Sequence, residues 1–285
     1  VDTVGEYTVT NLASATFTVD PTFDGSANQN MLTGADTLGV AATATITFDL
    51  TFFPDLADAP FINQAVGTGV GAVSGTGTAD GSVDGTDPDG IDNDNSPDEN
   101  SPTIIYVPAI GVAKAASAPT NNGDGTFTIP MTVTLENFGT EALTNVQITD
   151  DLTTQFGTFE AAQVDVDTVG EYTVTNLAST TLTVNAGFNG SGDQNLLTGA
   201  DGLALNGTAS VTFDLIIFPN YANAPFTNQA VSTGTGAISG AVVNDTSTDG
   251  TDPDTNNDEN PDENTPTPVE LPLIGIAKTV GGLVN

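Results

Sequence analysis

Two acidic segments carry the residues with the clearest potential for chemistry. Residues 80–99 and 245–263 hold sixteen of the chain's 37 acidic residues, interspersed with Asn, Gly and Pro. Carboxylates about 4 Å apart repel each other by roughly 1 kcal/mol in water, so an ordered segment of this kind needs compensation. Calcium supplies it well, because it takes six to eight oxygen ligands from carboxylates, Asn side chains and backbone carbonyls. The two segments therefore predict calcium binding.

The spacing of the acids supports this prediction. Aspartates at alternating short intervals place successive oxygens within reach of one ion as the chain wraps around it. The candidate ligands are Asp84, Asp87, Asp89, Asp92, Asp94, Asp98 and Glu99 in the first segment and Asp249, Asp252, Asp254, Asp258, Asp262 and Glu263 in the second. The alternative is a pair of solvated linkers whose charge maintains solubility. Neither segment matches an EF-hand loop, but the patterning favours calcium over the linker.

A second loop offers another acidic cluster. Asp24, Asn28 and Asp36 lie in one loop, and residues 189–201 repeat it. These side chains could hold an ion, but Asn, Gly and Asp are also the usual residues of tight turns. We interpret the loop as turn chemistry.

The two lysines are the only cationic side chains. Lys114 and Lys278 end two similar stretches, IGVAK at residues 110–114 and IGIAK at residues 274–278, which are both expected to form strands. In some β-sheet domains a lysine of the first strand is joined to an asparagine of a late strand by an isopeptide bond. Asn228 is a possible acceptor here, with Asp214 or Glu136 as the assisting acid. The interpretation favoured from the sequence is a lysine at a strand edge that discourages mispairing.

The composition excludes several classes of protein. The chain has no Cys, His, Trp or Arg, and its net charge is -35. Without His or Cys, the common nucleophile pairs and zinc sites are absent. Two lysines cannot neutralise a row of phosphates, which excludes nucleic-acid binding. No apolar run reaches the roughly 18 residues of a membrane span. Because aromatic residues are only 6%, a sugar-stacking hydrolase is also rejected, and we expect no enzymatic activity.

An internal repeat organises the chain. VDTVGEYTVTNLAS at residues 1–14 recurs letter for letter at residues 166–179, an offset of 165. The match continues to GTDPD at residues 85–89 and 250–254, and IGVAK at 110–114 returns as IGIAK at 274–278. This register predicts three pieces: residues 1–103 as the C-terminal part of one repeat, 104–270 as a complete repeat, and 271–285 as the first strand of the next.

Within a repeat the apolar residues alternate with a period of two. Residues 126–136 place Phe127, Ile129, Met131, Val133 and Leu135 on one face, and residues 46–52 and 210–217 alternate likewise. Such strands bury one face and leave a threonine-rich face in water. Turn clusters separate them, and no helical stripe appears. The expected fold is all-β, with tandem immunoglobulin-like β-sandwich repeats joined by the acidic segments.

These motifs resemble one bacterial repeat family. IGVAK, GDGTFTIPMTVTLENFGTEALTNVQITDDL and DGTDPD with a downstream PTPV are similar to the conserved immunoglobulin-like repeat of giant secreted and surface proteins. The resemblance covers essentially the whole chain. It implies an immunoglobulin-like sandwich, an extracellular or cell-surface location and a structural or adhesive role. It supplies no catalytic residues.

The leading functional expectation is a structural subunit or repeat of an extracellular bacterial filament or surface stalk, stiffened by calcium. The partner would be another copy of the repeat, either in a longer array or by self-association. In the second case the tail at residues 271–285 would complete the open sandwich of the next chain by β-strand addition. The alternative is an adhesin module that binds a glycan or a cell-surface protein.

Overall fold

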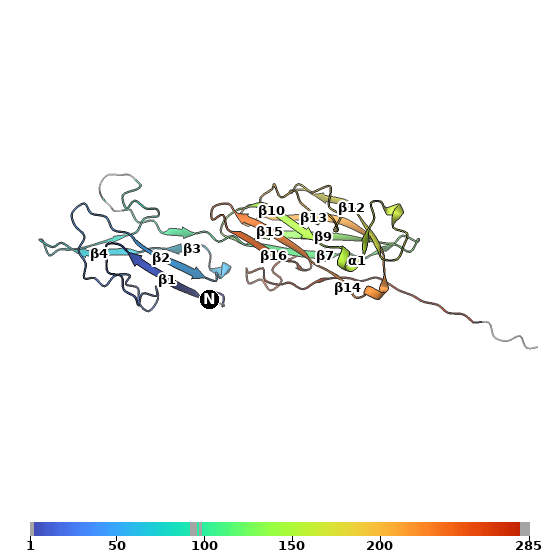
Figure 1. Cartoon of the computed structure of the whole chain (residues 1–285), viewed down its shortest axis with the longest axis horizontal. Coiled ribbons are helices and arrows are strands. Elements are labelled where there is room, and N and C mark those ends of the chain that lie inside the picture. The colour runs from blue at the N-terminus through green and yellow to red at the C-terminus, as the bar shows by residue number, and fades with distance from the viewer. Residues whose placement is uncertain (1–2, 92–95, 97–98, 280–285) are drawn as a thin grey trace, which may run out of the picture. The chain divides into compact units, whose positions relative to one another are not determined.

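The structure is a computed structural model that describes residues 3–91, 96 and 99–279. It confirms the all-β class, since the helical elements of the described residues are single short turns (Figure 1). These turns are η1 (Leu56–Asp58), α1 (Thr153–Phe156), η2 (Gln163–Asp165) and η3 (Tyr221–Asn223). Strands dominate because the sequence alternates apolar and polar residues rather than following a helical period.

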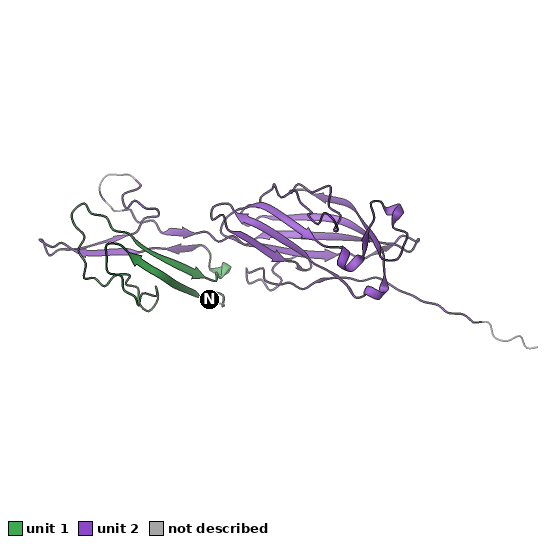
Figure 2. Cartoon of the chain, in the orientation of Figure 1, with its two compact units in different colours: residues 1–59 green, residues 60–285 purple. Residues whose placement is uncertain are grey.

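The chain divides into two compact units, residues 1–59 and 60–285 (Figure 2). The first unit contains an antiparallel pair, β1 (Tyr7–Ser14) and β2 (Ile46–Phe52). Between them the chain forms a looped segment that is tied by an isolated bridge from Val19 to Leu32. Phe23 packs edge-on against Phe48 of β2 with ring centroids 5.8 Å apart.

The second unit begins with two small antiparallel pairs and continues into a larger two-sheet body. The small pairs are β3 (Phe61–Asn63) with β6 (Thr103–Ile105) and β4 (Val66–Val70) with β5 (Gly77–Gly81). The strands that follow are β7 (Ile110–Ala116), β8 (Thr120–Asn121), β9 (Phe127–Asn137), β10 (Leu143–Asp150), β11 (Thr158–Phe159), β12 (Glu171–Ser179), β13 (Thr208–Phe218), β14 (Phe226–Asn228), β15 (Ala230–Gly236), β16 (Val242–Thr246), β17 (Thr248–Asp249) and β18 (Thr267–Val269).

Two sheets of this body share one hydrophobic core. One sheet has the order β11-β12-β13-β9-β7-β17, with β8 beside β9, and the other has the order β10-β15-β16. A single cluster of buried side chains takes Val133 and Val211 from the first sheet and Ile148 and Ala230 from the second. The body is therefore sandwich-like. The pair β14-β18 lies apart from both sheets in the hydrogen-bonding pattern.

The expected alternation is confirmed in the second unit. Every apolar residue that was placed on one face of residues 126–136 is buried, and so are the alternate residues of β13 from Val211 to Ile217. In β2 of the first unit the equivalent face is only partly covered, and Leu50 is 39% exposed.

The two sequence copies form the same local structure. The pair β1-β2 and the pair β12-β13 have the same register shift, between Thr10 and Ala13 in one and between Thr175 and Ala178 in the other. The asparagine in each shift has a positive φ, 55° at Asn11 and 57° at Asn176. Each asparagine side chain donates to an aspartate of the partner strand, at 2.6 Å to Asp49 and at 2.7 Å to Asp214. A local sequence match of this length thus dictates the same bulge twice.

Candidate functional site

A buried cluster of three polar side chains lies within the two-sheet body. Lys114 of β7 is fully buried, and Asp150 at the end of β10 and Asn228 at the end of β14 are 1% and 4% exposed. The Lys114 Nζ donates hydrogen bonds to Asp150 Oδ2 and to Asn228 Oδ1. Asn228 Nδ2 donates to Asp150 Oδ1 at 2.8 Å and to the Asp151 carbonyl at 3.3 Å. Each of the three side chains therefore contacts the other two.

The strand alternation explains why these polar groups point inward. Lys114 follows Ile110 and Val112 on the core face of β7, and the ring of Phe213 lies 5.5 Å from its Nζ. Asp150 likewise continues the buried face formed by Val146 and Ile148 on β10. Asn228 stands between the buried residues Phe226 and Ala230 in the same alternation. A period of two thus directs one amine, one carboxyl and one amide into the core.

Burial decides the protonation chemistry of the amine. Loss of solvation lowers the pKa of Lys114, against the opposing effect of the Asp150 charge and hydrogen bond. An apolar environment disfavours the ammonium form, which increases the share of the neutral amine.

The structure corrects two interpretations made from the sequence. The strand-edge role of Lys114 is wrong, because β7 pairs with both β9 and β17 and the side chain faces the core. The acid nearest to this amine is Asp150 rather than Asp214 or Glu136. Asp214 accepts from Asn176 on the outer face of the sheet, and Glu136 faces the second acidic segment. Asp150 was not predicted from the sequence. The signal that could have found it is its position in β10, where the alternation places buried, apolar residues.

The second acidic segment lies against the outer face of β7. A Cβ added to Gly111 would stand 2.7 Å from Pro261 and 2.9 Å from Pro253, so both prolines pack directly on that glycine. Asp254, which follows Pro253, is 5% exposed and accepts from the backbone N–H groups of Asp258 at 3.2 Å and Glu259 at 2.8 Å. The segment is therefore packed on the sheet and uses its own carboxylates to hold its turns.

Carboxylates accumulate where this segment meets the sheet. Burial, together with the charges of Asp252, Glu259 and Asp254, raises the pKa of Glu136. The pKa of Asp245 is raised to about 7, mainly by burial and further by the charges of Glu263 and Asp262. The hydrogen bonds that its carboxylate accepts from the backbone N–H groups of Val112 and Thr246 oppose this rise. A positive charge close to these carboxylates would lower the pKa values of both Glu136 and Asp245.

The candidate calcium ligands do not converge in the described structure. Among the described residues, no three His, Cys, Asp or Glu side chains lie close enough together to hold one metal ion. Six of the ten described candidates have exposed side chains, whereas Asp254 is buried and Asp89, Glu99 and Glu263 are partly buried. Asp92, Asp94 and Asp98 lie outside the described residues. Calcium binding stays a prediction.

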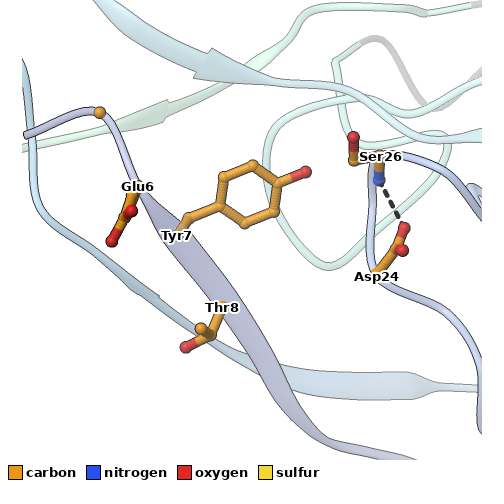
Figure 3. A pocket seen from close by; sticks show the side chains of 6 residues that line it. Glu6, Tyr7, Thr8, Asp24 and Ser26 are labelled. Atoms are coloured by element: carbon orange, nitrogen blue, oxygen red, sulfur yellow. Dashed lines mark hydrogen bonds between the residues drawn. The ribbon is translucent and has the colours of Figure 1, made fainter. Parts of the chain in front are cut away.

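Turn chemistry accounts for the loop at residues 24–36. Asp24 Oδ1 accepts from the backbone N–H of Ser26 at 2.9 Å (Figure 3). It also accepts from the backbone N–H of Asn28 at 2.9 Å. Those backbone hydrogen bonds lower the pKa of Asp24. In the second copy Asn189 occupies the equivalent position and accepts from Ser191 and Asp193 in the same way. Because a neutral amide performs the same task, the carboxylate is not needed as a metal ligand.

A shallow hollow of about 460 Å³ lies beside this loop in the first unit. Figure 3 shows Tyr7 projecting from β1 towards the turn that contains Asp24 and Ser26. In the second copy the residue equivalent to Tyr7 is Tyr172, which β11 covers: Phe159 packs edge-on against it at 5.9 Å. The tyrosine that lines the hollow in the first copy is therefore covered by strand β11 in the second copy.

Two comparisons with known proteins found no match. No family model matches the chain, and no curated protein matches it. Within the described part of the chain, none of the helices has the length and apolar character to cross a membrane.

Proposed function

We propose that the chain is a structural repeat of an extracellular bacterial filament or surface stalk, built from immunoglobulin-like sandwiches in tandem. The observation that carries the proposal is the duplicated local structure of the two sequence copies, with the same bulge and the same Asn–Asp hydrogen bond. Duplicated units of one fold favour an array in which each copy performs the same mechanical task. The resemblance to the repeat of giant surface proteins supports the same role and an extracellular location.

The partner proposed is another copy of the same repeat. Tyr7 and Leu50 of the first copy are 41% and 39% exposed, whereas their equivalents Tyr172 and Leu215 are fully buried. These apolar residues are buried in the second copy and exposed in the first. Contact with a further copy of the repeat could bury them in the first copy as well. That copy would stand in a longer chain or in a neighbouring one, where β-strand addition would provide the pairing.

Calcium would stiffen this array at the acidic segments. The support is electrostatic: burial, and then the neighbouring carboxylates, raise the pKa values of Glu136 and Asp245, and a divalent cation would offset this unfavourable accumulation of negative charge. An ion bound there would add its binding free energy to the folded state.

Negative-stain electron microscopy of the native material, before and after EDTA, tests the proposal. Uniform rods that soften in EDTA support both the array and calcium, and rods that are indifferent to EDTA support the array without the metal. Isolated short particles in both conditions contradict the array and favour an adhesin module. Denaturing electrophoresis then separates assembled chains, which give a band near 28.8 kDa, from one long array, which gives a much larger band.

A further inference from the structure

The buried cluster of Lys114, Asp150 and Asn228 is difficult to explain as a stability device. The chain has two lysines, and one of them is fully buried in a hydrophobic core beside one of its 37 acidic residues. A buried ion pair loses solvation on both sides, and well-packed apolar residues of similar size are often equally stable or better. The arrangement therefore calls for a chemical reason.

The contacts within the cluster are those of a reaction between the amine and the amide. Nζ of Lys114 touches Oδ1 of Asn228, one bond away from the electrophilic carbon Cγ. The same carboxyl group of Asp150 contacts the amine through Oδ2 and the amide nitrogen Nδ2 through Oδ1. One carboxyl group thus reaches both the attacking nitrogen and the leaving nitrogen, as an acid–base catalyst must.

The surroundings activate the nucleophile. An amine attacks only in its neutral form, and burial lowers the pKa of Lys114 in the direction of that form. The neighbouring Phe213 ring and the core around it exclude the water that would solvate an ammonium ion. A lysine that is desolvated in an apolar pocket is a known type of activated nucleophile.

We propose that Lys114 and Asn228 join through an intramolecular isopeptide bond, with Asp150 as the catalytic residue. Asp150 takes a proton from the Lys114 ammonium, and the neutral Nζ attacks Cγ of Asn228. The Nζ–Cγ bond forms and the Cγ–Nδ2 bond breaks, while Nδ2 receives a proton through Asp150 and leaves as ammonia. The second Nζ proton is released by the same route, so the overall change is the loss of one ammonium ion, and no oxidant or reductant takes part.

The bond would join strands that belong to different sheets. Lys114 lies on β7 in the larger sheet, and Asn228 lies on β14, which pairs with β18. In the other copies the matching residues are separate: Asn63 is the equivalent of Asn228 and Lys278 is the equivalent of Lys114, and both are exposed. They provide matched controls within the same chain.

The intact mass of the denatured full chain is the first test. We expect a mass lower than that of the sequence by about 17 Da, which is one ammonia. Asn–Gly pairs, such as Asn189–Gly190 and Asn206–Gly207, can lose the same mass by forming a succinimide, so the mass alone does not assign the bond. A mass equal to that of the unmodified sequence overturns the proposal.

Digestion with trypsin after denaturation assigns the bond. An acylated Lys114 resists cleavage, so we expect one fragment of residues 1–278 and the peptide 279–285. Fragments of residues 1–114 and 115–278 would mean a free amine and would overturn the proposal even if ammonia had been lost.

Variants then assign the roles. Lys114→Met and Asn228→Ala should each restore the unmodified mass, whereas the matched controls Lys278→Met and Asn63→Ala should keep the loss of ammonia. Asp150→Asn retains both reactants, and we expect it to leave the amine free, with trypsin now cutting after residue 114. Because a misfolded variant would also be unreacted, circular dichroism of each variant accompanies the mass. A folded Asp150→Asn protein that still forms the bond at the wild-type rate contradicts the role of Asp150.

Discussion

Asp245 makes the stability of the second unit depend on pH in a direction that can be calculated. Its pKa is about 7 in the folded chain, against 3.8 for an aspartate in an unfolded chain. Between these two values the folded state binds more protons than the unfolded state, so the free energy of unfolding falls as the pH rises. Below about pH 4 both states are protonated and the group contributes nothing, and above about pH 7 the loss is complete.

The size of this effect follows from the shift. About three pH units at 1.36 kcal/mol each give an upper limit of about 4 kcal/mol. Since the Asp245 side chain is only partly buried, screening by solvent reduces this value, and we expect about 2 kcal/mol. Asp245→Asn removes the charge and keeps an oxygen for the Val112 N–H at 2.7 Å, whereas the hydrogen bond from the Thr246 N–H is lost at every pH. Measured against the wild type, the variant should therefore be about 2 kcal/mol more stable at pH 8 than at pH 4.

Urea unfolding with EDTA present, followed by far-UV circular dichroism, measures this difference. Asp80→Asn is the matched control, because Asp80 is the equivalent residue in the first copy and its substitution changes the net charge by the same amount. Equal gains in the two variants would attribute the effect to total charge rather than to burial. Parallel pH profiles for the wild type and Asp245→Asn between pH 4 and 8 would refute the reasoning.

Three further results follow from the burial, the hydrogen bonds and the charges. Leu215→Ala should lower the free energy of unfolding by about 2–5 kcal/mol, whereas Leu50→Ala at the equivalent, 39% exposed position should cost about 1 kcal/mol or less; equal losses in urea titrations would contradict the difference in packing. Asn137→Ala should cost about 1–3 kcal/mol, because the buried Nδ2 donates to the carbonyls of Glu141, Leu203 and Ala204, and an unchanged urea midpoint would argue against these bonds. Calcium at about 1 mM should raise the melting temperature, and EDTA should reverse the rise; a melting temperature that is indifferent to calcium would remove the metal from the proposed function.

The sequence was most informative about strands and their faces. The alternation in residues 126–136 predicts which side chains of β9 are buried, because a strand with one face in a core must alternate. The local repeat also carries its own bulge, since Asn176 and Asp214 bring the required side chains with them. These features depend on residues that are close along the chain or directly paired.

The buried cluster could not be assembled from the sequence in the same way. Asn228 could be proposed as a partner of Lys114, but the acid depends on how β10 approaches β7 across the core, and no local pattern determines that approach. Asp214 lies between the buried residues Phe213 and Leu215 on β13, so the alternation places it on the outer face, away from Lys114. A stricter use of the alternation would have helped, because Lys114 and Asp150 both occupy positions where an apolar residue is expected.

The parallel pairing of β17 with β7 determines how this body would respond to a pulling force. Thr248 and Asp249 lie beside Ala113 and Lys114 with both strands running in the same direction. A tension applied through the chain before β7 and after β17 would slide these strands along each other, so their hydrogen bonds would have to break together rather than one after another. The rate of forced unfolding would then be set by one high barrier. With Lys114 bonded to Asn228, the load would pass through that bond, and residues 115–227 would remain folded while the array was stretched.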